Sequence, residues 1–166
     1  MVTGAASGIG LACAARYAQE GAVVIGFDLN EAEDWEGATQ GASEALFFTG
    51  SVCDYEALEA VVKETVERFK RIDVLCTAAG IGGGGPVHSL DPAEWDRVQE
   101  VNLKGTFLSA KAALPTMMEQ RSGSIVFIAS IEGIIGAEGG STYNASKGGV
   151  ISLTKNMALD YGRLGI

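Results

Sequence analysis

The sequence has little that would support a disulfide, a metal site or a membrane anchor. Its three cysteines are an odd number without a CxxC pair, and its single histidine, His88, has no second histidine with which to share a metal. We therefore expect no metal site, an exposed His88, and free, buried thiols at Cys13, Cys53 and Cys76. No apolar run approaches the ~18 residues of a membrane-spanning helix, and the first residues lack the layout of a signal peptide.

Basic side chains are also scarce. Lysine and arginine number 12 against 21 aspartate and glutamate residues, which gives a formal net charge of −9 over 166 residues. Such a chain is repelled by a phosphate backbone, so a nucleic-acid partner is not expected. The GxSxG, HExxH and Walker A motifs are absent too, which argues against hydrolase and nucleoside triphosphatase functions. We expect a soluble cytoplasmic protein.

Short apolar runs alternate with helical patterns along the whole chain, which we interpret as one domain over residues 1–166. The runs that predict buried strands are 22–28, 45–49, 72–78 and 124–130. The helical patterns cover 8–20, 54–70, 91–120 and 142–161, with Pro115 expected to kink the third. This order predicts an α/β fold with a doubly wound parallel sheet and helices on both faces. Ligands of such sheets bind beyond the carboxyl ends of the strands.

Glycine is abundant, with 23 residues, about twice the usual share of ~7%. The segment 3–10, TGAASGIG, precedes the first helical pattern and lets the backbone turn tightly where the positive end of a helix suits a pyrophosphate. The alternative is a glycine-rich turn that only closes a helix on a strand. A second glycine-rich segment, 80–85, also follows a strand, but no helix begins after it. We expect it to be a mobile loop over the cleft and not a phosphate site.

An acidic residue, Asp28, ends the next predicted strand, 18 residues after Gly10. A dinucleotide-binding fold carries its ribose-binding carboxylate at this position. A carboxylate about 4 Å from a 2′-phosphate would cost on the order of 4 kcal/mol at an effective dielectric of 20, whereas it can accept hydrogen bonds from free ribose hydroxyls. The residue therefore favours NAD over NADP. The alternative is that Asp28 caps a turn through Asn30.

Four polar residues form a candidate proton-transfer site. Tyr143 and Lys147 are four residues apart and share one face of a predicted helix. A tyrosine titrates near 10 and needs a shift of about 3 units, or roughly 4 kcal/mol, to act near neutral pH. A lysine charge about 4 Å away supplies an energy of that order. Ser130 ends the last apolar run, and Asn102 is the unusual polar residue within an apolar stretch of helix.

Taken together, these residues resemble the short-chain dehydrogenase/reductase family over nearly the whole chain. The turn 3–10 is similar to the family's TGxxxGxG, segment 77–80 (TAAG) to its NAAG, and the four polar residues follow its catalytic order. The resemblance implies a Rossmann-like fold and hydride transfer between NAD(H) and a secondary alcohol or ketone. It implies that Tyr143 moves the hydroxyl proton and that Ser130 holds the substrate oxygen. Lys147 would hold the nicotinamide ribose and lower the Tyr143 pKa, and Asn102 would seat a water.

The resemblance also assigns a set of cofactor-binding residues. They are Gly4, Ser7, Gly8, Ile9, Gly10, Asp28, Leu29, Val52, Ala79, Gly80, Tyr143 and Lys147. Two positions depart from the family pattern. Thr77 replaces the asparagine of NAAG, which we expect to weaken a hydrogen bond that braces the sheet. Ser51 stands where the family often carries an aspartate near the adenine, so only Val52 is carried over there.

Both ends of the chain differ from the family. Only Met1 and Val2 precede Thr3, where the family has a complete first strand, and the family's last strands, nicotinamide loop and substrate lid have no counterpart. We therefore expect a fragment of a longer domain, and we leave open a catalytically inactive dinucleotide-binding fragment. The substrate also stays open among sugar alcohols, steroids, cyclic diols and 3-oxoacyl thioesters.

The two long helices carry small and apolar residues that could form a surface between subunits. They are Ala110, Ala113, Val150 and Leu153. Many members of the family pair through these helices, so the resemblance implies a homodimer or homotetramer. Core packing within one chain is the alternative explanation of the same pattern.

Overall fold

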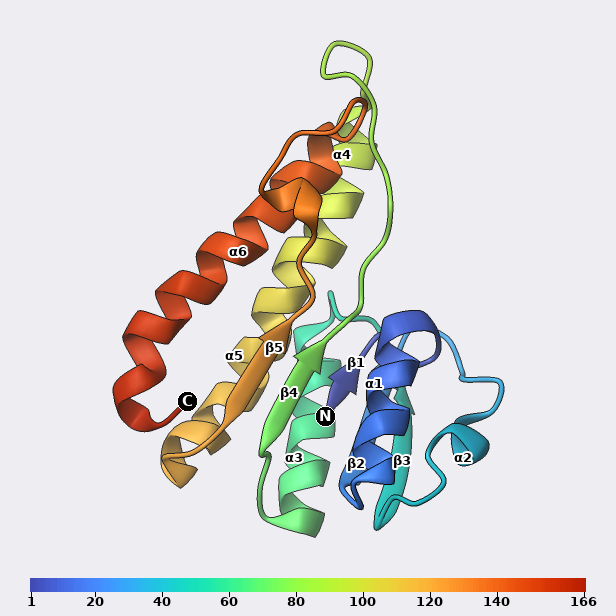
Figure 1. The fold of residues 1–166 in the computed structure, drawn as a ribbon, viewed down its shortest axis with the longest axis vertical. Helices are drawn as coiled ribbons and strands as arrows, with labels where there is room; N and C mark the ends of the chain where they lie inside the picture. The colour runs from blue at the N-terminus through green and yellow to red at the C-terminus, as the bar shows by residue number, and fades with distance from the viewer.

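A five-stranded sheet forms the centre of the computed structural model, which describes all 166 residues (Figure 1). The strands are β1 (Val2–Thr3), β2 (Val23–Asp28), β3 (Glu44–Thr49), β4 (Val74–Thr77) and β5 (Ser124–Phe127). Their order is β3-β2-β1-β4-β5, and every neighbouring pair is parallel. All the predicted strands are present, although β4 and β5 are shorter than the apolar runs that predicted them. Because the sheet is parallel, the loops that follow its strands gather at one edge.

Six α-helices lie between the strands and after the last one. They are α1 (Gly8–Gln19), α2 (Trp35–Ala38), α3 (Tyr55–Phe69), α4 (Pro92–Gln99), α5 (Gly105–Gln120) and α6 (Ser141–Tyr161). The helix starts follow local chemistry, because Asp54 accepts a hydrogen bond from the Ala57 N–H at 3.1 Å and Asp91 accepts one from the Ala93 N–H at 2.9 Å. Gly21 adopts a left-handed φ of 75° just past the end of α1.

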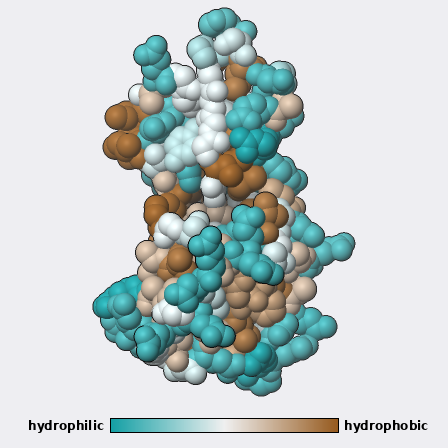
Figure 2. All heavy atoms as spheres, turned by 90° about the vertical axis from the view of Figure 1, so that its right-hand side faces the viewer, coloured by the Kyte–Doolittle hydropathy of each residue, from teal (hydrophilic) through white to brown (hydrophobic).

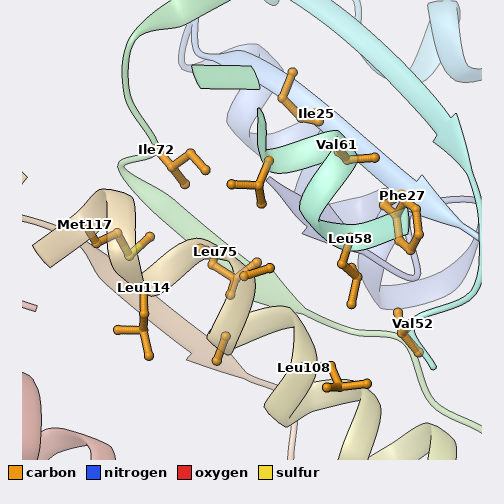
Figure 3. Packing of buried hydrophobic residues seen from close by; sticks show 14 residues of the cluster. Ile25, Phe27, Val52, Leu58, Val61, Ile72, Leu75, Leu108, Leu114 and Met117 are labelled. Atoms are coloured by element: carbon orange, nitrogen blue, oxygen red, sulfur yellow. The ribbon is translucent and has the colours of Figure 1, made fainter. Parts of the chain in front are cut away.

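Alternate residues of the strands pack against helices on opposite faces of the sheet, as the sequence predicted. Figure 3 shows Ile25 and Phe27 of β2 and Leu75 of β4 packing with residues of α3 and α5, which include Leu58, Val61, Leu108, Leu114 and Met117. On the other face, Val24 and Cys76 pack with Ala14 and Ala18 of α1. Full burial of a large aliphatic or aromatic side chain contributes roughly 1.5–3 kcal/mol. These contacts confirm the doubly wound, Rossmann-like architecture.

The central strand β1 is only two residues long. The Met1 ammonium continues its ladder by donating to the Val74 carbonyl at 2.9 Å, and an apolar cavity of about 310 Å³ lies beside Met1 between β2 and β4. Thr3 of β1 and Thr77 of β4 are register partners, and both of their buried hydroxyls lack a hydrogen-bond partner. The Thr77 hydroxyl therefore makes no hydrogen bond that would stabilise the sheet, in line with the weakening expected for a threonine at this position.

A π-helical turn at Glu100–Lys104 interrupts the long helix expected over 91–120. The chain then continues as α5 through Pro115 to Gln120. This π-helical turn, which includes Asn102, is an irregularity that the sequence did not predict, and the kink expected at Pro115 stays a prediction. π-Helical turns are rare and are often found at functional sites.

The expectation of three free, buried cysteines is only partly correct. All three cysteines are free, but only Cys76 is buried, whereas Cys13 and Cys53 are partly exposed. The reason for Cys13 is that α1 turns only Gly10, Ala14 and Ala18 fully toward the sheet. His88 is exposed, as predicted.

No helix has both the length and the hydropathy needed to cross a membrane.

Most of the small residues considered for a subunit surface are buried inside the chain. Ala110, Ala113 and Val150 are at most 1% exposed, and Leu153 is partly buried. Core packing within one chain accounts for the three buried residues, so the pattern carries no argument for an interface between subunits.

Candidate functional site

The turn between β1 and α1 depends on glycine at particular positions. Gly4 has a left-handed φ of 69°, and a Cβ added to it would lie 2.5 Å from the Ala79 nitrogen. A Cβ added to Gly10 would overlap the Gly4 carbonyl oxygen. The turn therefore packs directly against the loop after β4. Ser7 caps α1 without a side-chain hydrogen bond, so the first N–H groups of the helix have no side-chain acceptor and are available to an anion.

Asp28 lies at the carboxyl end of β2, next to this turn. Its Oδ2 accepts a hydrogen bond from the Ala6 N–H at 3.0 Å, and its Oδ1 accepts one from the Asn30 N–H at 3.0 Å. The turn-capping role is therefore present, and the same carboxylate also holds the glycine-rich turn. It faces a cavity of about 390 Å³. Ten of the predicted cofactor-binding residues line this cavity, namely Gly4, Ser7, Gly8, Ile9, Gly10, Asp28, Leu29, Val52, Ala79 and Gly80.

A second cavity, of about 520 Å³, adjoins the first. The two share Ile9, Ala78, Gly80 and Ile81 along their walls. Tyr143, Lys147, Glu132 and Gly140 line only the second cavity. Figure 2 shows the molecule narrowing at mid-height, with hydrophobic residues around the narrowing. The two cavities form one groove that leads from the Asp28 end to Tyr143.

Lys147 is a buried cation at the Tyr143 end of the groove. The residue is 6% exposed, and Nζ donates to the Ile128 carbonyl at 2.8 Å. Burial lowers the pKa of Lys147 below its ordinary value. The ammonium lies 5.7 Å from the centre of the Tyr143 ring. A Cβ added to Gly80 would lie 3.6 Å from Lys147 Nζ and 3.3 Å from Asn102 Oδ1, so ammonium and amide lie near each other behind Gly80.

Asn102 connects the loop after β4 to α6. Its Oδ1 accepts from the Ile81 N–H at 2.8 Å, and its Nδ2 donates to the Ile81 carbonyl at 2.9 Å and to Ser146 Oγ at 3.2 Å. Ser146 Oγ in turn donates to the Tyr143 carbonyl at 2.7 Å. A fully buried amide with these partners fixes the two segments that carry Gly80 and Tyr143.

Sequence reasoning did not identify Ser146 or Ile81 as parts of this network. Ser146 could have been found, because it lies one helical turn from Tyr143 between two predicted site residues. The role of Ile81 belongs to its main chain and leaves no sequence signal.

Ser130 lies three residues beyond the end of β5, because the strand ends at Phe127. It caps a short 3₁₀ turn, Ile131–Gly133, and its Oγ accepts from the Glu132 N–H at 3.2 Å. The turn packs closely on α6, since a Cβ added to Gly133 would lie 2.7 Å from the Lys147 carbonyl carbon. Ser130 thus lies beside the helix turn that carries Tyr143 and Lys147, but no hydrogen bond joins Ser130 to Tyr143.

The glycine-rich loop 80–85 lies along the second cavity, where Gly82 and Gly83 form part of the wall. Its far end is fixed by a bridge between Gly85 and Gly140 and by a hydrogen bond from Ser141 Oγ to the Gly85 carbonyl at 2.7 Å. No helix begins directly after it, which agrees with the sequence-based choice between the two glycine-rich segments. The chain contains no group of three or more histidine, cysteine, aspartate or glutamate side chains that could hold a metal ion.

Comparison with known proteins places this geometry in a family. Levodione reductase of Leifsonia aquatica is 42% identical over an alignment of 173 positions, gaps included. The alignment covers all of this chain and 64% of the levodione reductase. The structure of an NAD⁺-bound xylitol dehydrogenase superposes with a TM-score of 0.94 at 37% identity, over 99% of this chain and 65% of that one. Actinorhodin polyketide ketoreductase with NADPH gives a TM-score of 0.92 at 38% identity, with coverages of 99% and 65%.

The match extends over the whole chain, although the chain spans only about two thirds of the length of these proteins. The family model described as short chain dehydrogenase matches residues 1–166, and the relatives and solved structures agree with it in sequence and in fold. The chain therefore belongs to the short-chain dehydrogenase/reductase family of oxidoreductases.

Proposed function

We propose that the protein transfers a hydride between NAD(H) and a secondary alcohol or ketone, and that residues 1–166 form one dinucleotide-binding domain. The observation that supports this most is the groove, which has the α1 N-terminus and Asp28 at one end and Tyr143 with Lys147 at the other. A long ligand with an anionic group near the α1 N-terminus and a reactive end near Tyr143 would contact both ends of the groove. A nicotinamide dinucleotide has this form.

The residues present fit such a cofactor. Gly4 and Gly10 leave no room for a Cβ, so the backbone of the turn can approach a pyrophosphate closely. The two structural relatives contain NAD⁺ in one case and NADPH in the other, so the family leaves the choice between them open. Asp28 supports NAD, because its carboxylate lines the cavity and would repel a 2′-phosphate.

The residues near Tyr143 support proton transfer at the substrate oxygen. The bound dinucleotide would supply the hydride chemistry. Tyr143 would take or return the proton of the substrate hydroxyl, and the Lys147 charge would stabilise its phenolate form. Lys147 Nζ donates one hydrogen bond, to the Ile128 carbonyl, so its other N–H groups can donate to ribose hydroxyls.

The other two residues of the proposed site have different tasks. Ser130 uses its oxygen to accept from the Glu132 N–H, which leaves its own proton for the substrate oxygen. Asn102 positions Gly80 and Tyr143 through its bonds to Ile81 and Ser146.

Two titrations followed by a turnover assay test the proposal. NADH should bind more tightly than NADPH, as measured by nicotinamide fluorescence, and Asp28→Asn should reduce this preference because it removes the repelling charge. Absorbance at the nicotinamide band should then rise when NAD⁺ and a panel of secondary alcohols are added. Binding of NADH without any turnover would favour the inactive dinucleotide-binding alternative. Tighter binding of NADPH would contradict the assignment of NAD.

A further inference from the structure

The second cavity has an uneven distribution of charge. Glu132 and Lys147 are its only charged lining residues. Lys147 lies behind Gly80, which both cavities share, and its ammonium donates to the Ile128 carbonyl. Glu132 lines only the second cavity, together with Gly82, Gly83 and Gly140. Glu132 is therefore the only carboxylate that lines the second cavity.

This carboxylate is held in place. The Glu132 N–H donates to Ser130 Oγ, in the turn that packs on α6. The side-chain amide of Asn144 is oriented so that its oxygen faces a donor and its nitrogen faces acceptors. Its oxygen then accepts from the Ala137 N–H at 2.8 Å, and its nitrogen donates to Glu132 Oε2 at 2.6 Å. No lysine or arginine forms an ion pair with Glu132. No ion pair therefore compensates its negative charge, and Oε1 can accept a hydrogen bond from a ligand.

A fixed carboxylate recognises some substituents and rejects others. It accepts charge-assisted hydrogen bonds from hydroxyl groups, which are stronger than bonds between neutral groups. It repels a carboxylate, sulfonate or phosphate on the same ligand, and the repulsion is larger in a partly buried site than in water. The net charge of −9 acts in the same direction.

We infer that Glu132 determines the substrate class of the proposed active site. The site takes uncharged diols and polyols, or the corresponding hydroxyketones, whose second hydroxyl donates to Glu132 while the first reacts at Tyr143. It excludes compounds that carry an anionic group beside the reacting carbon. This inference rests on the proposed function, because it places the reacting hydroxyl at Tyr143.

The test compares two ligands that differ only in the second substituent, cyclohexane-1,2-diol and 2-hydroxycyclohexanecarboxylate. The protein is saturated with NADH, and each ligand is titrated while the fluorescence of bound NADH is followed, so that no turnover is needed. We expect the diol to bind at least tenfold more tightly than the hydroxy acid. Glu132→Gln keeps an acceptor for Asn144 but removes the charge, and it should reduce this ratio about tenfold or more. Glu138→Gln, at an exposed position of the same segment, is the control and should keep the original ratio.

The outcomes separate this inference from the proposed function. An unchanged ratio in Glu132→Gln overturns the role of Glu132 and leaves the cofactor assignment intact. If NADH binds but neither ligand affects its fluorescence, the substrate class is wrong. If NADH itself does not bind, the proposed function fails and the inference fails with it.

Discussion

At the scale of single residues, the site combines a buried amide, Asn102, with a buried ammonium, Lys147. Asn102 satisfies its amide through Ile81 and Ser146, whereas Lys147 keeps a charge that has only one neutral partner. Such a lysine is unfavourable for folding, since burial penalises its charged form. We interpret its presence as a functional requirement of the proposed chemistry.

This cost of burying Lys147 should be visible in the pH dependence of stability. The pKa of Lys147 is lowered below 10.5 in the folded chain, so above the folded value the unfolded chain binds more protons. The free energy of unfolding should therefore rise between the folded pKa and 10.5, by about 1.4 kcal/mol per unit of lowering. Urea unfolding from about pH 8 to about pH 10 should therefore show the free energy of unfolding of wild type rising relative to that of Lys147→Met, because the raised pKa values of Cys76 and Tyr17, which act in the opposite direction, are present in both proteins.

The exposed Lys155 of the same helix gives the matched control. Lys155→Met should keep the pH slope of wild type, because an exposed lysine has a similar environment in the folded and unfolded chain. Identical slopes in all three proteins would contradict the account of Lys147.

At the scale of elements, the sequence predicted strands and helices well because each has a local cause. The apolar run of β2 needs cover on both faces, and Asp54 and Asp91 start their helices by accepting backbone hydrogen bonds. The π-helical turn at Glu100–Lys104 was not predicted, because no residue type favours it. It contains Asn102, whose side-chain amide bonds to the main chain of Ile81. The end of β5 was misjudged since the apolar run continues into the loop before Ser130.

The glycine-rich turn provides a test at this scale. Gly10→Ala places a Cβ on the Gly4 carbonyl oxygen, so the turn must move away from α1. Overpacking of this kind costs about 1–3 kcal/mol. We expect a loss of about 2 kcal/mol in the free energy of unfolding, measured by urea titration, together with weaker NADH binding.

Gly162→Ala is the comparison variant, because open space surrounds that position and its φ is −56°. It should keep NADH affinity and leave stability unchanged or raise it by about 0.4–1 kcal/mol. Equal effects of the two substitutions would show that the close approach at Gly10 has no importance.

At the scale of the whole molecule, the groove is formed by segments that lie far apart in the sequence. The glycine-rich turn, the loop after β4, the turn after β5 and α6 are far apart in sequence, yet all of them line the two cavities. Periodicity could predict the elements, and the resemblance to a family could predict the residues of the groove. The hydrogen bonds between segments, such as those of Asn102 and Glu132, required the structure.

A ligand that contacts all these segments should stabilise the entire fold. At a concentration about 100-fold above its dissociation constant, NADH should add about 2.7 kcal/mol to the free energy of unfolding. For a chain of this length, that corresponds to a rise in Tm of about 5–10 °C. Differential scanning fluorimetry measures the shift, and NADPH at the same concentration should give a smaller one. No shift with either dinucleotide would contradict the proposed binding groove.

The central claim is that Tyr143 exchanges a proton with a substrate oxygen at the end of this groove. The most direct measurement compares wild type with Tyr143→Phe in a turnover assay with NAD⁺ and a secondary alcohol, alongside an NADH fluorescence titration. The account predicts that the variant loses turnover by about 10²- to 10⁴-fold and keeps its NADH affinity. Turnover close to that of wild type in Tyr143→Phe would contradict it.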